Sequence, residues 1–225
     1  MARLILPLMF GIAGVAVLMA LGFWQLSRLD EKQTVIAEIE ARIGAAPVTL
    51  PEAPEEARDR YLPVFAEGYY TGEAAHVLSS QREQGTGSRV IAVFETNAGR
   101  RILVDRGFLP DVARPGADFA SDTVRIVGNL HWPRDATSST PPPDLARGLW
   151  FSRTVAPLAA HLDTEALLIV ARQDGAGVAG LITMPVATID IRNDHLEYAI
   201  TWFLLALVWA GMTGFLLWRI RRGTA

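Results

Sequence analysis

The stretch that decides the fold is residues 193–222, NDHLEYAITWFLLALVWAGMTGFLLWRIRR. From Tyr198 to Trp218 it carries no charged side chain for roughly 21 residues, enough for a helix to cross a hydrocarbon core of about 30 Å. His195 stands at the edge of this apolar run, where an imidazole is a natural ligand for a lipophilic metal cofactor. The stretch therefore predicts a transmembrane helix over residues 198–218, with a candidate metal ligand before it and a short tail at 219–225.

A second apolar run lies near the other end of the chain and predicts a transmembrane helix over residues 4–27. Arg3 gives this run the basic start of a cleaved signal peptide. The run is longer than the roughly 15 apolar residues usual for such a signal, and Trp24 and Gln25 occupy the place where cleavage would fall. We therefore expect the segment to be retained as an anchor.

Arginines beside the two runs predict their orientation, because charges in short tails carry most of the topogenic weight. Arg3 precedes the first run, and Arg219, Arg221 and Arg222 close the second. Both termini are thus expected in the cytoplasm, with the segment between the runs on the far side. Because the start does not resemble an Arg- and Ser-rich organellar presequence, we expect a bacterial inner membrane and a periplasmic domain.

The composition limits the chemistry of the chain. It has no cysteine, which excludes disulfides, thiolate zinc sites and haem attachment through cysteines. The formal net charge of -3 argues against nucleic acid as a partner. We find no spacing typical of zinc hydrolases, phosphate-binding loops or serine hydrolases. The sequence therefore does not indicate an enzyme.

The segment between the two runs has the size of one domain with its own core, which we expect over residues 47–197. Residues 28–46 are predicted to extend the first span as a juxtamembrane helix, and residues 47–60 to form a Pro- and Glu-rich linker. The predicted class is a membrane protein of α+β type, with two transmembrane helices flanking a β-rich periplasmic domain.

Within that domain the patterns predict short strands, one helix and two loops. The strands, the first two of them paired as a hairpin, are expected at 90–96, 101–108, 124–130 and 167–171. The helix is expected at 152–163, and the loops at 133–148 and 175–180. The histidines of this segment are expected at the surface or in loops; they are His76, His131 and His161.

The second span could hold a cofactor on one of its faces. A helical period places His195, Trp202 and Trp209 along one face, with Tyr198 and Ala199 in the same stripe. A flat macrocycle could use this face, with the imidazole on its metal and aromatic rings at its edge. Interfacial anchoring is the commoner role of such residues, since Tyr and Trp are enriched at membrane interfaces. Both interpretations stay open from chemistry alone.

The first span ends with Trp24, Gln25 and Arg28. Arg28 could pair with an anionic carboxylate such as Asp194 or a haem propionate. The alternative is an aromatic belt with a snorkelling arginine.

Small residues predict that the two spans approach each other closely, because small side chains at four-residue spacing let helices pack tightly in lipid. These residues are Ala16 and Ala20 in the first span, and Ala206, Ala210 and Gly214 in the second. Such pairing would bring Gln25 and its neighbours near His195. Helices of a partner protein could use the same faces instead.

Motifs at the two ends of the chain resemble the Surfeit-locus (Shy-type) family of cytochrome c oxidase assembly proteins. The first is Leu21-Gly22-x-Trp24-Gln25-x-x-Arg28-x-x-x-Lys32, and the last is His195-Leu196-x-Tyr198-Ala199-x-Thr201-Trp202-Phe203-x-Leu205-Ala206. Between them, residues 99–110 resemble the family's central signature. Residues 68–70 and 150–153 match weaker elements in the expected order.

The resemblance implies a bacterial assembly factor for haem-copper terminal oxidases that binds haem a and assists its insertion into the catalytic subunit. It maps the iron ligand onto His195 and places Trp202 against the macrocycle. It implies the catalytic subunit, haem a synthase and the lipid bilayer as partners. With the residues near the membrane edge, the expected cofactor-binding set is His195, Trp202, Tyr198, Trp24, Gln25 and Arg28.

Asp105-Arg106-Gly107, inside the central signature, has two interpretations. One is a turn with positive φ at Gly107 and a local pair between Asp105 and Arg106. The other is a docking surface for an oxidase subunit.

Other functions remain as alternatives. A cofactor-free scaffold would bind oxidase subunits through the periplasmic domain. A sensor with two anchors would need an output module, for which the tail of about seven residues after Trp218 is short. Haem a synthesis would need several membrane histidines, and only His195 lies at a span.

Overall fold

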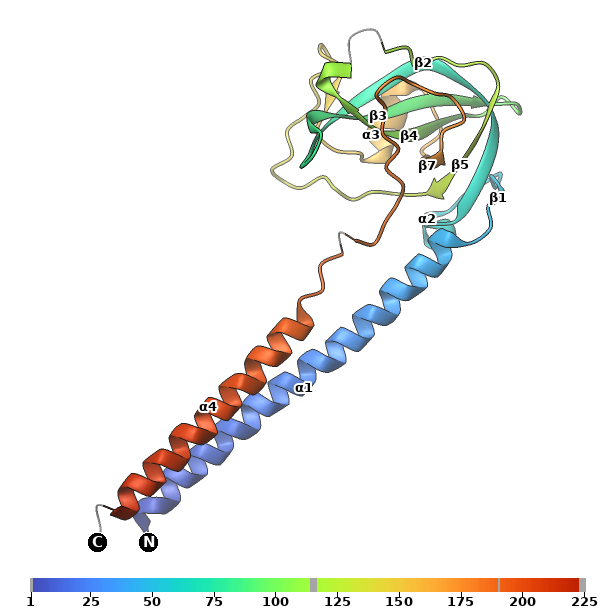
Figure 1. Cartoon of the computed structure of the whole chain (residues 1–225). Coiled ribbons are helices and arrows are strands. Elements are labelled where there is room, and N and C mark those ends of the chain that lie inside the picture. Colours follow the sequence, from blue (N-terminus) through green and yellow to red (C-terminus); the bar gives the residue numbers. More distant parts are fainter. Residues whose placement is uncertain (1, 114–116, 190, 223–225) are drawn as a thin grey trace. The chain divides into compact units, whose positions relative to one another are not determined.

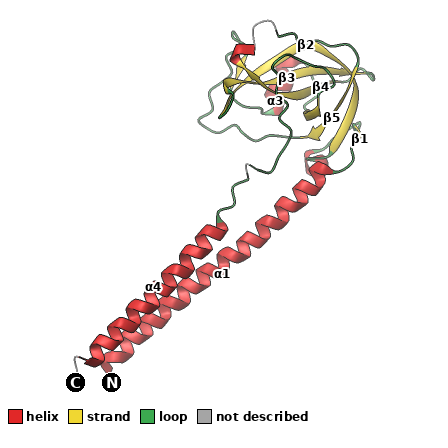
Figure 2. Cartoon of the chain, in the orientation of Figure 1, coloured by secondary structure: helices red, strands yellow, loops and turns green. Residues whose placement is uncertain are grey.

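The computed structural model describes residues 2–113, 117–189 and 191–222, in two compact units (Figure 1). One unit is helical and comprises Met1–Glu38 and Thr188–Ala225; the other comprises Ile39–Ala187 and holds the sheet. Figure 2 shows the strands, all of them in the second unit, and the two long helices α1 and α4. The predicted class, a membrane protein with terminal helices flanking a β-rich domain, is confirmed.

The two long helices are α1 (Ala2–Gly44) and α4 (His195–Arg222), and both are long and apolar enough to cross a membrane. α1 continues unbroken through the predicted juxtamembrane helix, and it ends at Gly44, where a glycine ahead of Pro47 favours termination. α4 begins before the predicted residue 198, so that His195 is its first helical residue.

Glycines of α1 allow close contact with α4. A Cβ on Gly11 would lie 2.2 Å from Cγ2 of Thr213, and one on Gly14 would lie 2.2 Å from Nε1 of Trp209. Farther along, a Cβ on Gly22 would lie 2.4 Å from the ring of Phe203. The predicted close pairing of the two spans is therefore confirmed, but it depends on glycines that the small-residue pattern did not include.

The residues that α4 turns toward α1 follow a seven-residue repeat. Ala199 and Ala206 are buried, and Thr213 contacts Gly11. The predicted Ala210 and Gly214 are exposed, as are Ala16 and Ala20 on α1, so this part of the prediction is wrong. The reason is geometric: residues four apart turn about 40° per step around a helix of 3.6 residues per turn, whereas a seven-residue repeat stays on one face.

Replacing Gly14 with isoleucine is expected to weaken the association of α1 and α4 by about 1–3 kcal/mol, because the side chain would overlap the Trp209 indole. Steric trapping of the full chain in bicelles would measure the loss. Gly214→Ile is the matched control, since nothing lies within 4 Å of the Cβ position there. Equal losses in the two variants would contradict the observed packing.

The second unit is built on one seven-stranded sheet. Its strands are β1 (Val48–Thr49), β2 (Pro63–Gln81), β3 (Gly85–Thr96), β4 (Arg101–Pro110), β5 (Val124–Leu130), β6 (Leu149–Trp150) and β7 (Leu168–Gln173). Its helices are α2 (Glu56–Asp59), the 3₁₀ helix η1 (Asp111–Ala113) and α3 (Val155–Leu162). The four predicted strands, the hairpin and the helix are confirmed with small shifts of their ends. The predicted linker 47–60 contains β1 and α2.

Five strands close into a ring, because β2 pairs with two partners. Its residues 63–68 pair with β5 and its residues 68–81 with β3, while β4 and β7 complete the order β2-β3-β4-β7-β5. β4 and β7 run parallel and the other neighbours in the ring run antiparallel. Closure pairs the edges that an open sheet would expose. The sequence did not predict β2.

Strands β3, β4 and β7 are buried on both faces. Along β3, Ala92 and Phe94 belong to one hydrophobic cluster and Ile91 and Val93 to another, which follows from the two-residue period of a strand. The second cluster receives the apolar face of α3, formed by Val155, Leu158, Ala159 and Leu162.

Asp105-Arg106-Gly107 lies inside strand β4 and is not a turn. The pairing with β3 is irregular there: Val90 lies opposite Gly107 and Ile91 opposite Asp105, which leaves Arg106 as the extra residue of a β-bulge. Gly107 has the expected positive φ, 124°, and a Cβ would lie 2.1 Å from the carbonyl oxygen of Ile182. Asp105 and Arg106 are fully buried, so the docking interpretation is also wrong.

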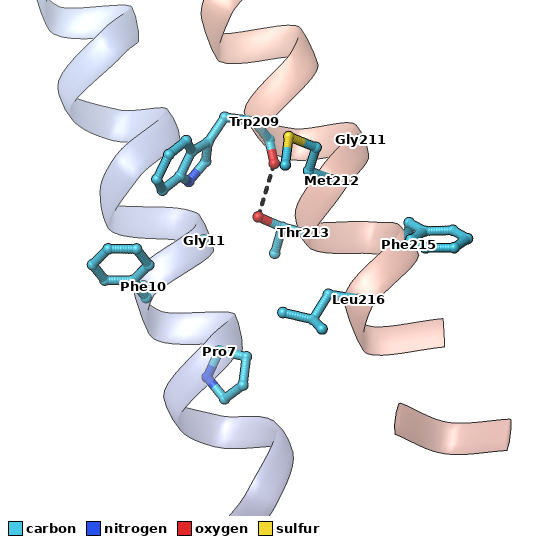
Figure 3. A pocket seen from close by; sticks show the side chains of 9 residues that line it. All are labelled: Pro7, Phe10, Gly11, Trp209, Gly211, Met212, Thr213, Phe215 and Leu216. Carbon is cyan, nitrogen blue, oxygen red and sulfur yellow. Dashed lines mark hydrogen bonds between the residues drawn. The ribbon is translucent and has the colours of Figure 1, made fainter. Parts of the chain in front are cut away.

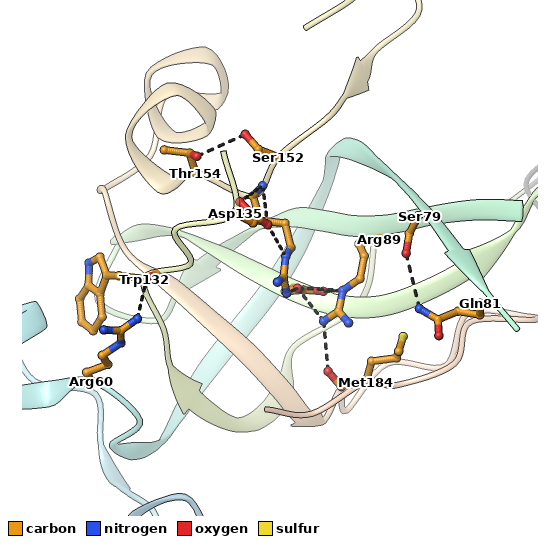
Figure 4. Close-up of polar contacts among 11 residues, drawn as sticks. Arg60, Ser79, Gln81, Arg89, Trp132, Asp135, Ser152, Thr154 and Met184 are labelled. Atoms are coloured by element: carbon orange, nitrogen blue, oxygen red, sulfur yellow. Dashed lines mark hydrogen bonds and ion pairs between the residues drawn. The ribbon is translucent and has the colours of Figure 1, made fainter. Parts of the chain in front are cut away.

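The two charged residues of the bulge pair with distant groups instead of each other. Asp105 accepts hydrogen bonds from Arg89 at 2.7 Å and Arg153 at 3.4 Å. Arg89 also donates to the Met184 carbonyl (Figure 4). Arg153 donates to the Asp135 carboxylate. These contacts fix β3, β4 and two loops to one another.

The histidines of the sheet unit differ in their surroundings. His161 is exposed on α3, as expected. His76 lies in β2, with Nδ1 3.1 Å from the Ser88 hydroxyl. His131 is half-buried and stacks on the Tyr61 ring. Burial, together with the positive charges of Arg153 and Arg60, lowers the pKa of its imidazole to about 4. His131 thus lies in a loop, as expected, although it is half-buried, whereas His76 lies within a strand and departs from the expectation of a surface or loop position.

His131 is expected to make the unit less stable as the pH falls from about 6.5 toward 4. In this window the unfolded chain takes up a proton at the imidazole and the folded chain does not. His131→Phe, which keeps an aromatic ring beside Tyr61, should lose less free energy of unfolding between pH 7 and pH 5 than the wild type. His161→Phe serves as the exposed control, and chemical unfolding in detergent is the measurement. If His131→Phe had the same pH dependence as the wild type, His131 would not be the group that lowers the stability at acidic pH.

Candidate functional site

A side-chain hydrogen bond joins the two long helices at the start of α4. Nδ1 of His195 lies 2.7 Å from Oε1 of Gln25, which projects from α1. Gln25 is only 9% exposed, although it is a polar residue in an apolar helix. The expectation that pairing of the spans would bring Gln25 to His195 is therefore confirmed.

Some neighbours of His195 are buried between the two long helices and others are exposed. Ala199, one turn along α4, is buried, and Trp202 is half-buried two turns along. Tyr198 is 55% exposed and Trp24 is 53% exposed, so neither lies between the helices. Tyr198 and Ala199 therefore do not share one stripe, as was expected, because the seven-residue repeat of the pair buries Ala199 and leaves Tyr198 exposed.

Charged side chains surround this end of the helix pair. Arg28 pairs with Glu31 at 2.6 Å, and Arg192 pairs with Asp194, so the expected Arg28–Asp194 pair is absent from the described residues. Glu31 lies one turn from Arg28 on the same helix and is the nearer partner. Lys32 donates to the backbone carbonyl of Arg192. Exposed ion pairs are weak, so an incoming anion can compete for Arg28 and Arg192.

The surroundings of His195 have three features that a metal-bearing macrocycle could use. A single imidazole suits a metal whose other ligands come from a macrocycle. Apolar helix surface beside it suits the hydrophobic body of the group. Arg28, Lys32 and Arg192 add positive charge that could pair with carboxylates of a bound group. Lys32 belongs to the terminal motif quoted above, whereas Arg192 carries no sequence signal that would have marked it.

An apolar cavity of about 540 Å³ lies elsewhere along the helix pair, on the half of α4 away from His195. In Figure 3, Pro7, Phe10 and Gly11 of α1 line one side, and the other lining residues come from α4. The hydroxyl of Thr213 already donates to the carbonyl of Trp209. The walls are therefore mostly hydrocarbon, although Nε1 of the lining residue Trp209 is buried without a hydrogen-bond partner among the described residues.

Comparison with known proteins gives a consistent assignment. The model of the SURF1 family matches residues 12–207. A SURF1-like protein of Rickettsia felis is 30% identical over 202 residues, covering 85% of this chain and 88% of its own length. A SURF1-like protein of Monosiga brevicollis is 28% identical, covering 87% and 82%. Surfeit locus protein 1 of Xenopus tropicalis is also 28% identical, covering 82% and 67%. Because the match includes both the Gln25 and the His195 helices, the chain belongs to the SURF1 family.

Proposed function

We propose that this protein is an assembly factor for a haem-copper terminal oxidase of the cytochrome c oxidase type, and that it binds haem a and assists its insertion into the catalytic subunit. The observation that carries the proposal is the placement of His195 beside Gln25, at the end of two paired apolar helices. Membership of the SURF1 family supports the assembly role.

Residues of this chain would hold haem a by three kinds of contact. His195 would supply an axial nitrogen, and the half-buried Trp202 would contact the macrocycle. Arg28, Lys32 and Arg192 would pair with the propionates. When bound, haem a supplies the redox-active iron that the oxidase requires. The exposed residues Tyr198 and Trp24 would contact the group only from the lipid side.

A single protein ligand suits a carrier better than a resident site. One imidazole would hold the iron with moderate strength and so would allow it to be passed to the receiving subunit. Surface that faces lipid also allows an exchange within the bilayer, so that a hydrophobic cofactor need not pass through water. Both properties favour delivery to a partner over permanent retention.

The proposed location is a bacterial inner membrane, with both termini in the cytoplasm and the sheet unit in the periplasm. Arg219, Arg221 and Arg222 in the last turn of α4 support this orientation through the positive-inside rule. The catalytic subunit and haem a synthase are the proposed partners. Lipid surrounds the helices, whose apolar side chains are largely exposed.

Haem a content of the assembled oxidase tests the proposed function in cells. Deleting the gene should lower haem a per catalytic subunit, and the wild-type gene should restore it. The His195→Ala gene should restore it poorly, and the His161→Ala gene fully. Full restoration by His195→Ala would favour a cofactor-free scaffold that stabilises oxidase subunits.

A further inference from the structure

We propose that Gln25 is the positioning residue of His195: its side-chain oxygen holds the imidazole in the tautomer with the proton on Nδ1, and so leaves Nε2 as the nitrogen that binds iron. The statement about iron rests on the proposed haem-binding function. The statement about the tautomer rests on the contact alone.

The atoms in contact determine which tautomer this hydrogen bond needs. Oε1 of Gln25 is a carbonyl oxygen and accepts only, so a hydrogen bond across 2.7 Å requires Nδ1 of His195 to be the donor. A neutral imidazole with its proton on Nδ1 carries its free lone pair on Nε2. Among the described residues, no hydrogen bond of Nε2 to the protein is found, so this lone pair is available to a metal.

Packing keeps Gln25 in place. Its side chain is 9% exposed, and Gly22, one turn before it on α1, is covered by the Phe203 ring of α4. Phe203 also packs edge-to-face on Phe23, with ring centroids 5.4 Å apart. A buried amide flanked by such contacts has little freedom to turn away from the imidazole. The hydrogen bond is therefore present before any cofactor arrives.

An oxygen acceptor on the second nitrogen changes how an imidazole binds metal. It fixes the ring plane and raises the basicity of the ligating nitrogen, and loss of such a partner typically costs about 10–100-fold in metal affinity. Gln25 acts through His195 in this way, without contact to the iron. Aliphatic residues at position 25 would leave the ring free to rotate and to adopt the other tautomer.

Nuclear magnetic resonance of the full chain, haem-free and in detergent, tests the tautomer. Histidine is labelled with ¹⁵N, and the His195 signals are identified by their loss in His195→Ala. We expect a protonated Nδ1 and a bare Nε2 in the wild type and in Gln25→Glu, which keeps an oxygen acceptor. In Gln25→Leu the proton should shift toward Nε2, and Gln33→Leu, at an exposed position of α1, should match the wild type. A wild-type His195 with its proton on Nε2, or no change in Gln25→Leu, would overturn the proposal.

Titration with haem a tests the consequence for the iron. Gln25→Leu should bind about 10–100-fold more weakly than the wild type and show a lower iron–histidine stretching frequency in the reduced state, while Gln25→Glu keeps both properties. If His195→Ala loses haem but Gln25→Leu matches the wild type in both, Gln25 has no positioning role and the haem function stands. If His195→Ala binds haem as the wild type does, the haem function fails at this site, whatever the tautomer.

Discussion

Replacing His195 with alanine is expected to reduce the haem that co-purifies with the full chain to background. In the proposed site the His195 imidazole supplies the lone pair that binds the iron. The nearby arginine and lysine side chains cannot replace it, because their charged groups have no free lone pair. The fold should survive, because the residues that bring α1 and α4 together, Gly11, Gly14 and Gly22, are untouched. Haem content per protein, by absorption after detergent extraction, is the measurement.

Two comparisons make this expectation specific. His161→Ala, at an exposed position of α3, should keep wild-type haem content. Trp202→Ala should retain His195 but lose contact with the macrocycle, so we expect an intermediate haem content. Unchanged haem in His195→Ala, with unchanged circular dichroism, would mean that another group holds the cofactor.

Replacing Arg106 with methionine is expected to lower the free energy of unfolding by about 3–5 kcal/mol, because Asp174 would keep its charge in a protected position without a cationic partner. Arg106 is fully buried and donates twice to Asp174, at 2.9 and 2.7 Å. Its guanidinium also lies 3.8 Å from the Tyr70 ring centroid. Burial raises the pKa of the Tyr70 phenol, which stays protonated and donates to Asp174 at 2.6 Å.

Chemical unfolding of the full chain in detergent, followed by tryptophan fluorescence, would measure this loss. Arg134→Met is the matched control: Arg134 is 76% exposed in its pair with Glu56, and such pairs contribute about 0–1 kcal/mol. Adding Asp174→Asn to Arg106→Met should recover part of the loss by removing the unpaired charge. A loss in Arg106→Met as small as in Arg134→Met would show that the pair is not buried in solution.

Local sequence signals were sufficient for the long helices and for several strands. Apolar length predicted α1 and α4, and the strand predicted over residues 124–130 coincides with β5 (Val124–Leu130). Strand β2 was missed because it changes partner partway and bends at Gly72, whose φ is 93°. Such a strand mixes polar and apolar residues in a pattern that only its two neighbours explain.

Long-range partners explain the predictions that failed. Asp105-Arg106-Gly107 has the composition of a turn, but Arg89 and Asp174, far away in the sequence, stabilise it as a buried bulge. Arg28 was expected to reach Asp194, but Glu31 lies closer on its own helix. No local pattern contains this information, because it depends on which surfaces the fold brings together.

The sequence predicted the contact at the centre of the candidate site, because Gln25 and His195 lie at the same end of two spans that were expected to pair. The proximity of Gln25 and His195 follows once both lie at the same end of paired spans, and the structure places them in hydrogen-bond contact. The small residues alone did not predict which face of each helix turns toward the other. For this reason the outward position of Tyr198 became visible only in the structure.

The central claim is that His195 gives this chain a site for haem a. The most direct measurement is the absorption spectrum of the wild-type protein, purified in mild detergent from cells that make haem a. We expect a Soret band that shifts on reduction and a pyridine haemochrome of haem a type. A spectrum without haem bands, both as purified and after addition of haem a, would contradict the claim.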